Sequence, residues 1–420
     1  MTFQIIGPVH PHRIYCAGSF TKLLTTYVTL SLFSEKYSLA TILDDENFFD
    51  TLCKNKKSRE FLTLFQDTIG SKFTLHDICS FYAGLPYTFD LAEEELAIVD
   101  SGGAFKHHSI PDEKTFLERC KTKISLIYPD RCKFLYSEIS ILFLGYFVEQ
   151  VYEIKMEALY QKYIIDKFKL AHSQFSRTRV PGVHIEDLSD KYDYPSIAIL
   201  DHGYFCYSNG YYTTLHDLKI LLENFLSEPI FQFMTDINHG RAASNRLMNG
   251  LTVEIRKVGD DIIYGYEGLS FSGCNIWAYS TKHKKGYITF SNDEEAVYGV
   301  IYGQWGYEKF DIVPEYSQQA YREYVKNYHD VVEPKLIPKE YQGYYHRVKI
   351  NEKNLATKFL LGENYMVIRN PQEIRYELFY AFNAYRVIDK DGKHGPKVGL
   401  YTSRSGGRYM LFDGTLYKKI

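Results

Sequence analysis

A serine and a lysine stand three residues apart at the start of an apolar segment, where their side chains could act together. Ser19 and Lys22 open a stretch, residues 23–33, that is apolar on nearly every face of a predicted helix. Positions i and i+3 of a helix share a face, so the amine can hold or take the proton of the hydroxyl. The helix N-terminus favours developing negative charge. The pair therefore fits a serine nucleophile served by a lysine.

A simpler interpretation of Ser19 is a helix cap. Serine is favoured at the first position of a helix because its oxygen accepts from the free amides of the first turn. The spacing Ser-x-x-Lys also arises by chance in chains of 420 residues. Catalysis therefore requires partners further along the sequence.

Length and composition indicate a globular protein with two or three domains and a large core. Hydrophobic residues make up 45% and charged residues 24% of the chain, and the net charge of -3 is spread without long runs. This distribution argues against nucleic acid or an anionic membrane as the main partner. We expect a small-molecule or peptide substrate, and nothing in the sequence predicts the oligomeric state.

The cysteines and histidines do not form a metal-binding or disulfide pattern. The seven cysteines are scattered and never form Cys-x-x-Cys, which favours a reducing compartment. His10 and His12 flank a proline in a predicted solvated loop, and residues 389–392 resemble a calcium loop that lacks its closing acidic residue. We therefore predict no metal or cofactor. Without a leader-like N-terminus or a membrane-length apolar run, the expected location is cytoplasmic.

The predicted elements change character along the chain. Helical patterns dominate residues 45–225, including a helix opened by Thr74, helices over 112–127, 139–152 and 155–168, and a helix after Thr214. Residues 203–212 read as a loop. Beyond residue 250 the pattern alternates in strands, a closing helix is predicted over 316–330, and about eight short strands follow from residue 343. Their even spacing is typical of a small closed barrel.

In this order the motifs resemble the serine β-lactamase and penicillin-binding protein superfamily, in particular its class C-like esterases, D-aminopeptidases and lactamases. The resemblance covers residues 14–292. It rests on Ser19-Phe20-Thr21-Lys22, on the segment 73–86, on Tyr136-Ser137-Glu138, on the turn and helix 210–218, and on Tyr264-Gly265-Tyr266-Glu267-Gly268 at the place of the third motif.

The resemblance implies a mixed α/β (α+β) fold in two domains. Residues 1–332 would form a β-lactamase-like domain with an antiparallel sheet and an all-helical subdomain over about 45–225. Residues 333–420 would form an all-β barrel similar to the lipocalin-like domains of some relatives.

The resemblance also implies roles for individual residues. Ser19 would be the acylated nucleophile, Lys22 its proton partner, and Tyr136 the general base that also returns a proton to the leaving group. The amides of Ser19 and Leu269, the residue after Gly268, would form the oxyanion hole. Glu138, Tyr266, Glu267 and Gly268 would line the substrate site.

Three departures from the family pattern leave a second hypothesis open. Glu138 replaces the usual Asn and could hold Lys22 charged, and Tyr266 and Glu267 stand where a basic residue is usual. Eighteen residues precede Ser19, too few for the usual helix and strand pair, so we expect residues 3–6 or the C-terminal barrel to cover the sheet edge. The chain is thus either a serine hydrolase acting on a small ester or amide, or a catalytically silent relative that binds a ligand or protein.

Overall fold

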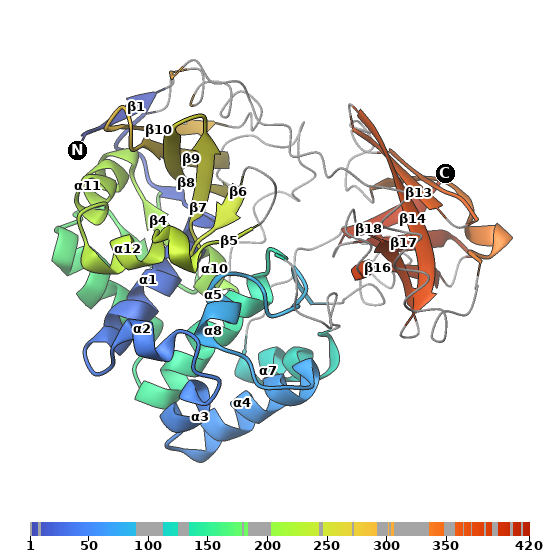
Figure 1. The fold of residues 1–420 in the computed structure, drawn as a ribbon, viewed down its shortest axis with the longest axis horizontal. Coiled ribbons are helices and arrows are strands. Elements are labelled where there is room, and N and C mark those ends of the chain that lie inside the picture. Colours follow the sequence, from blue (N-terminus) through green and yellow to red (C-terminus); the bar gives the residue numbers. More distant parts are fainter. Residues whose placement is uncertain are drawn as a thin grey trace.

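The computed structural model contains a sheet, a helical region and a C-terminal barrel (Figure 1). It describes residues 2–6, 10–89, 112–124, 134–178, 180–183, 203–242, 247–270, 273–291, 301, 304–305, 336–347, 358–363, 365–370, 372–381, 384–388, 394–403, 406–412 and 415–420.

Helices occupy most of the described chain between residues 20 and 239. They are α1 (Phe20–Ser34), α2 (Leu39–Ile42), α3 (Phe48–Leu52), α4 (Lys56–Ile69), α5 (Leu75–Cys79), α7 (Glu113–Thr122), α8 (Glu138–Tyr152), α9 (Met156–Tyr160), the π-helix η1 (Gln161–Asp166), α10 (Cys206–Asn209), α11 (Leu215–Phe225), α12 (Pro229–Met234) and the 3-10 turn η2 (Ile237–His239). Thr74 and Thr214 cap α5 and α11 as predicted, by accepting from the amides of Asp77 and Asp217. The predicted loop 203–212 is wrong in part, because it holds α10 and the first residues of a strand.

Seven strands form the main sheet. Its order is β1 (Thr2–Ile6), β10 (Lys285–Ser291), β9 (Gly273–Ser280), β8 (Asp261–Ser270), β7 (Glu254–Val258), β6 (Leu247–Asn249) and β5 (Arg241–Ala242). All neighbours are antiparallel except β1, which runs parallel to β10. The expectation of an antiparallel sheet is therefore wrong for β1, whose partner is distant in the sequence, so no hairpin dictates its direction.

The N-terminal strand covers an edge of the main sheet. Thr2 to Ile6 pair in register with Lys285 to Thr289, which confirms the expectation that residues 3–6 take this place. Phe3 is buried, and its ring packs near Trp277 and Tyr279 with centroids 6.3 and 5.9 Å away.

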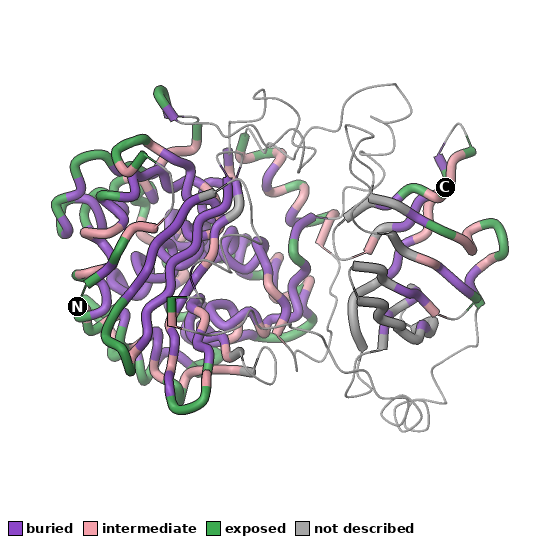
Figure 2. The backbone as a smooth tube through the Cα atoms, turned by 90° about the horizontal axis from the view of Figure 1, so that it is seen from above, coloured by how far each residue is buried: buried purple, intermediate pink, exposed green. Residues whose placement is uncertain are grey.

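Helix α1 is enclosed by the sheet on one side and by helices on the other. Every residue from Phe20 to Phe33 is buried, and α1 contacts β8, α8, α10 and α12. Figure 2 shows the same concentration of buried backbone in the strands and the enclosed helices. The all-round apolar pattern of the sequence thus has a direct cause. Two of the polar residues inside this helix have clear partners: Thr25 donates to the Tyr207 carbonyl at 2.6 Å, and Thr26 lies 2.8 Å from Thr252 Oγ1.

A second, small sheet fixes the chain just before α1. It consists of β2 (Tyr15–Cys16), β4 (Tyr211–Thr213) and β3 (Gln174–Phe175), with β4 in the middle. Because β2 ends three residues before Ser19, this pairing ties the start of α1 to the segment that follows α10.

The C-terminal strands close into a barrel of eight antiparallel strands. They are β11 (Gly343–Arg347), β12 (Lys358–Leu361), β13 (Tyr365–Asn370), β14 (Gln372–Ala381), β15 (Ala384–Ile388), β16 (His394–Thr402), β17 (Arg408–Phe412) and β18 (Thr415–Lys419), and β11 pairs with both β12 and β18. The number of strands agrees with the prediction from the sequence. The predicted helix 316–330 and the calcium-like turn 389–392 lie outside the described residues.

Large side chains and a chain segment fill the described part of the barrel. Tyr345, Met366 and Met410 are fully buried in one cluster. Ile337 joins this cluster from the segment before η3 (Lys339–Tyr341), and its amide donates to the Glu363 carbonyl at 2.8 Å. The interior thus resembles a protein core.

We predict that Phe3→Ala will lower the free energy of unfolding by about 3–5 kcal/mol, because a buried aromatic ring is lost from the sheet face. Gln4→Ala is the matched control, since Gln4 is exposed on the same strand and should change stability by less than about 0.5 kcal/mol. Denaturant unfolding measures both. Equal effects of the two changes would contradict the packing of β1 on this edge.

Candidate active site

Ser19 lies at the first turn of α1, but its side chain does not cap the helix. The amides of Phe20, Thr21 and Lys22 donate to the carbonyls of Ala17, Gly18 and Ser19 at 3.2, 2.9 and 3.0 Å. Gly18 has φ +54°, a conformation that glycine adopts readily. The backbone therefore satisfies the first turn, and the half-buried Ser19 hydroxyl remains available for other partners.

The main sheet holds the backbone before Ser19 through side-chain hydrogen bonds. Ser270 Oγ donates to the Cys16 carbonyl at 2.8 Å. Asn275 Nδ2 donates to the carbonyls of Ala17 and Gly268 at 3.0 and 3.1 Å. A Cβ atom at Gly268 would lie 2.1 Å from the Ala17 oxygen. Strand β8 therefore approaches Ser19 as closely as two backbones can, and this approach requires glycine at position 268.

Lys22 is enclosed directly behind Ser19. Its side chain has no exposure, and Nζ lies 2.7 Å from Ser19 Oγ and 3.4 Å from Glu138 Oε1. Nζ also lies 5.0 Å from the centre of the Tyr136 ring. Burial lowers the pKa of Lys22, and the neighbouring Glu138 carboxylate offsets that effect only in part. The amine is thus shifted toward its neutral, proton-accepting form.

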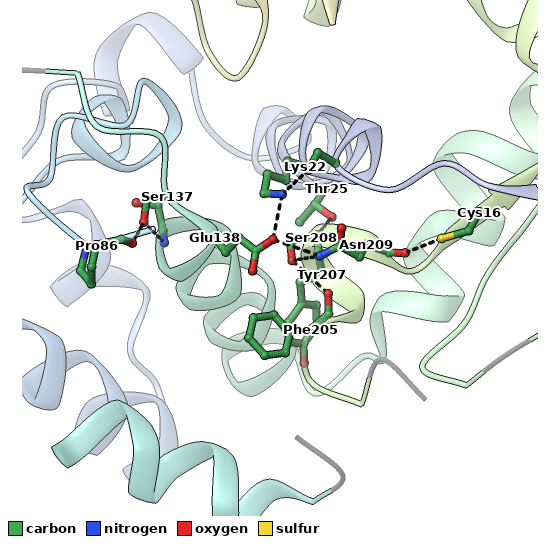
Figure 3. A network of polar contacts seen from close by, with 12 residues as sticks. Cys16, Lys22, Thr25, Pro86, Ser137, Glu138, Phe205, Tyr207, Ser208 and Asn209 are labelled. Carbon is green, nitrogen blue, oxygen red and sulfur yellow. Dashed lines mark hydrogen bonds and ion pairs between the residues drawn. The ribbon is translucent and has the colours of Figure 1, made fainter. Parts of the chain in front are cut away.

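Glu138 connects Lys22 to a segment far away in the sequence. Its Oε1 accepts from Lys22 Nζ and, at 3.2 Å, from Asn209 Nδ2 of α10 (Figure 3). The carboxylate belongs to the first residue of α8, where the helix dipole favours negative charge. Side chains from α1 and α10 therefore both donate to one oxygen atom of a residue in α8.

The segment that carries Tyr136 and Glu138 is held by the chain around residue 85. Leu135 and Glu138 donate backbone hydrogen bonds to the carbonyls of Phe81 and Tyr87 at 2.9 and 2.8 Å. Ser137 Oγ donates to the Pro86 carbonyl at 2.7 Å. The segment 73–86, singled out in the sequence, thus positions the second motif.

Tyr136 is half-buried beside Ser19. Burial and the nearby Tyr266 hydroxyl raise its pKa well above the usual value, although its interaction with the Ser19 hydroxyl acts in the opposite direction. Its ring stacks on Tyr87 at 5.9 Å, and Tyr87 is exposed. At neutral pH the Tyr136 phenol therefore carries its proton.

Tyr266 and Glu267, the two residues at the place of the basic residue in the third motif, point to opposite faces of β8 because side chains alternate along a strand. Tyr266 pairs with Trp277, whose ring faces Phe20 at 6.5 Å, so both lie on the α1 side of the sheet. Glu267 pairs with Ile276, which belongs to a cluster on the opposite face. The structure therefore brings Tyr266 toward Tyr136 and places Glu267 on the other face.

The structure brings most of the predicted site residues together. Those near Ser19 are Lys22, Glu138, Tyr136, Tyr266 and Gly268. Leu269 follows Gly268 on β8, next to the start of α1. The ladder between strands β8 and β7 ends at the pair of Gly265 and Glu254, before residues 266–269.

Sequence reasoning missed Asn209 and Asn275. Asn275 had a detectable signal, because an amide side chain is unusual in a strand whose residues are all buried. Asn209 lies within the glycine-punctuated segment taken as a loop, and no pattern there distinguishes it.

The arrangement of sheet, α1 and α8 is a fold shared with a penicillin-binding protein homologue, a D-stereospecific amidohydrolase and SurE. The chain is similar to the octameric penicillin-binding protein homologue from Pyrococcus abyssi (16% identity, 98% of this chain and 90% of that chain, TM-score 0.51). It is also similar to SurE (12%, 98% and 89%, TM-score 0.53) and to a D-stereospecific amidohydrolase from Streptomyces sp. (14%, 71% and 88%, TM-score 0.52). At these identities the similarity concerns the fold. No protein-family model and no curated protein matches the sequence.

Within the described residues, no helix combines the length and the apolar character needed to cross a membrane.

We predict that Gly268→Ala will separate β8 from α1, because its methyl group would overlap the Ala17 oxygen. Overpacking of this kind costs about 1–3 kcal/mol in unfolding free energy. The matched control is Gly259→Asn, a turn position with φ +61° and no atom within 4 Å of an added Cβ. Thermal unfolding compares the two, and unchanged stability of Gly268→Ala would contradict the close approach.

Proposed function

We propose that the protein is a serine hydrolase that acts through an acyl-enzyme on a small ester or amide. The observation that carries the proposal is the 2.7 Å distance between Lys22 Nζ and Ser19 Oγ, made by an amine whose pKa burial lowers. A lysine activated by desolvation beside a hydroxyl is a recognised form of nucleophile activation.

In the proposed acylation, Ser19 Oγ forms a bond to the substrate carbonyl carbon while its proton moves to Lys22 Nζ. The carbonyl π electrons move to oxygen, and the amides of Ser19 and Leu269 would hold that oxyanion. As the tetrahedral intermediate collapses, the bond to the leaving group breaks and Tyr136 returns a proton to it, then recovers a proton from Lys22. Water attacks the ester of Ser19 in the second half-reaction by the same route in reverse.

The assignment of the first proton transfer differs from the expectation from the sequence, where Tyr136 is the general base. The raised pKa of Tyr136 keeps its phenol protonated and so unable to take the first proton, while the lowered pKa of Lys22 favours its amine as the acceptor. Of the two roles expected for Tyr136, the proposal keeps the return of a proton.

The substrate proposal rests on the charges around the third motif. Tyr266 occupies the place of the usual basic residue, and its pKa is raised mainly by burial and less by the carboxylates of Glu267 and of Glu254, which pairs with Arg256. A substrate carboxylate there would meet like charge. Short esters and aminoacyl amides are therefore the proposed substrates, in line with the activity for which the D-stereospecific amidohydrolase of this fold is named. Glu267 lies on the opposite face of β8 and contributes charge without direct contact.

The proposed domain division is 1–332 and 333–420. It is supported by two buried clusters that share no residue, one within residues 3–290 and one within residues 337–417. The expected likeness of the C-terminal barrel to lipocalin-like domains stays a prediction.

The alternative is a catalytically silent protein that binds a ligand or partner. It draws on Glu138 and Tyr266, which replace the usual Asn and basic residue. A Lys22 amine beyond about 3.5 Å from Ser19 would favour it. The distance of 2.7 Å favours the hydrolase instead.

We predict that a fluorophosphonate probe will form one adduct on the wild-type protein and none on Ser19→Ala. Ser34→Ala, an exposed serine at the other end of α1, is the matched control and should be labelled normally. Intact mass spectrometry measures both. An adduct that persists in Ser19→Ala would overturn the proposed nucleophile.

We further predict that Tyr136→Phe will lose about 10²- to 10⁴-fold in kcat, since general acid–base help is worth that much. Tyr37→Phe is the control, because its ring packs on Phe48. Turnover of a p-nitrophenyl ester measures the effect, and full activity of Tyr136→Phe would exclude Tyr136 from proton transfer.

We predict faster turnover of a p-nitrophenyl ester or a D-aminoacyl anilide than of nitrocefin or a D-Ala-D-Ala peptide, because the last two carry carboxylates. A side-by-side assay at one enzyme concentration decides this. Fastest turnover of either carboxylate-bearing substrate would show that the charge argument is wrong.

A further inference from the structure

The ion pair between Lys22 and Glu138 is longer than the neighbouring hydrogen bond. Lys22 Nζ is 2.7 Å from Ser19 Oγ but 3.4 Å from Glu138 Oε1. Buried charge-assisted hydrogen bonds between an ammonium and a carboxylate are usually about 2.7–2.9 Å. Something therefore keeps this carboxylate from closing on the amine.

Asn209 is the group placed to do so. Its Nδ2 donates to the same Oε1 atom at 3.2 Å, from a different direction than Lys22 (Figure 3). A carboxylate only accepts, so the amide nitrogen must face it. Nδ2 also donates to Ser208 Oγ at 2.9 Å, and the Asn209 backbone amide donates to the Phe205 carbonyl at 3.0 Å. The donor is therefore fixed at the end of α10.

We propose that Asn209 is a positioning residue that holds the Glu138 carboxylate back from Lys22, so that the amine stays directed at Ser19. This inference rests on the proposed function and deepens it. Without Asn209, Oε1 would be free to approach Nζ, and Lys22 would be held as an ammonium that cannot take the Ser19 proton. With Asn209, the carboxylate remains near enough to stabilise the ammonium that forms during acylation, as the aspartate does in a Ser-His-Asp triad.

The charged and titratable groups around Lys22 are few. From α8 and the segment before it come Glu138 and Tyr136, and Ser19 lies on α1 itself. Tyr266 on β8 reaches Tyr136, not Lys22. Among the described residues, Glu138 is the one carboxylate paired with this amine, so its position governs how readily Lys22 loses its proton.

The test is a double-mutant cycle read by two methods. In the first, protein labelled with ¹³Cε-lysine is titrated by NMR, and the Lys22 signal is identified by its loss in Lys22→Met. In the second, the rate of fluorophosphonate labelling at Ser19 is followed against pH. Asn209→Leu, Glu138→Gln and the double variant are compared with wild type, and Asn209→Ala serves if the leucine side chain is not accommodated.

We expect Asn209→Leu to move the Lys22 titration midpoint upward by about 0.5–1 pH unit, the effect of one hydrogen bond of ordinary strength. The rising limb of the plot of labelling rate against pH should move to higher pH by the same amount, so that labelling at a pH below the midpoint becomes about three- to tenfold slower. Glu138→Gln should move the midpoint downward by about 1–3 pH units, because a neutral amide no longer favours the ammonium. In the Glu138→Gln background, Asn209→Leu should then have no further effect.

Asn224→Leu is the matched control, since Asn224 is exposed on α11 and its side-chain amide donates to the Ile220 carbonyl at 2.8 Å, far from Lys22 in the sequence. It should leave both readouts unchanged. An equal effect of Asn209→Leu in the wild-type and Glu138→Gln backgrounds, or no effect on the midpoint, would overturn the role of Asn209. If the wild-type protein forms no fluorophosphonate adduct, but the Lys22 titration midpoints of the variants shift as expected, the proposed hydrolase is refuted and the positioning role of Asn209 is retained.

Discussion

The burial of one lysine amine is the constraint on which the site depends. Lys22 has no solvent exposure, so water cannot stabilise its charge, and the cost falls on the few polar atoms around it. Those atoms are Ser19 Oγ and Glu138 Oε1, at 2.7 and 3.4 Å. Desolvation prevails over the single carboxylate, and the pKa of Lys22 falls. The same burial that would be unfavourable in an ordinary core favours the neutral amine that the proposed mechanism requires.

Two parts of the structure meet at this amine. On one side, strands β8 and β9 hold the backbone before Ser19 through Ser270, Asn275 and the missing side chain of Gly268. On the other, the chain around residue 85 fixes the start of α8, and with it Tyr136 and Glu138. Both parts therefore meet at the start of α1, where Ser19 and Lys22 lie one turn apart.

The replacement of the usual Asn by Glu138 has a structural counterpart. In the superfamily that the sequence resembles, an amide side chain ends the second motif, and here an amide reaches the same neighbourhood from Asn209, which follows that motif by 71 residues. The pair of Glu138 and Asn209 thus supplies both a carboxylate and an amide. Glu138 in place of the usual Asn is therefore compatible with an active site as well as with a silent one.

The sequence by itself determined the elements and most of the site. Periodicity, caps and turn residues predict α1, α5, α8, α11 and the eight barrel strands, because these signals are local. The spacing of Ser19 and Lys22 fixes their shared face for the same reason. Only the tertiary structure decided which face of β8 lies toward Ser19, that β1 pairs with β10 in parallel, and that Asn209 donates to Glu138. Each of these depends on contacts between distant segments, and no local preference in the chain encodes them.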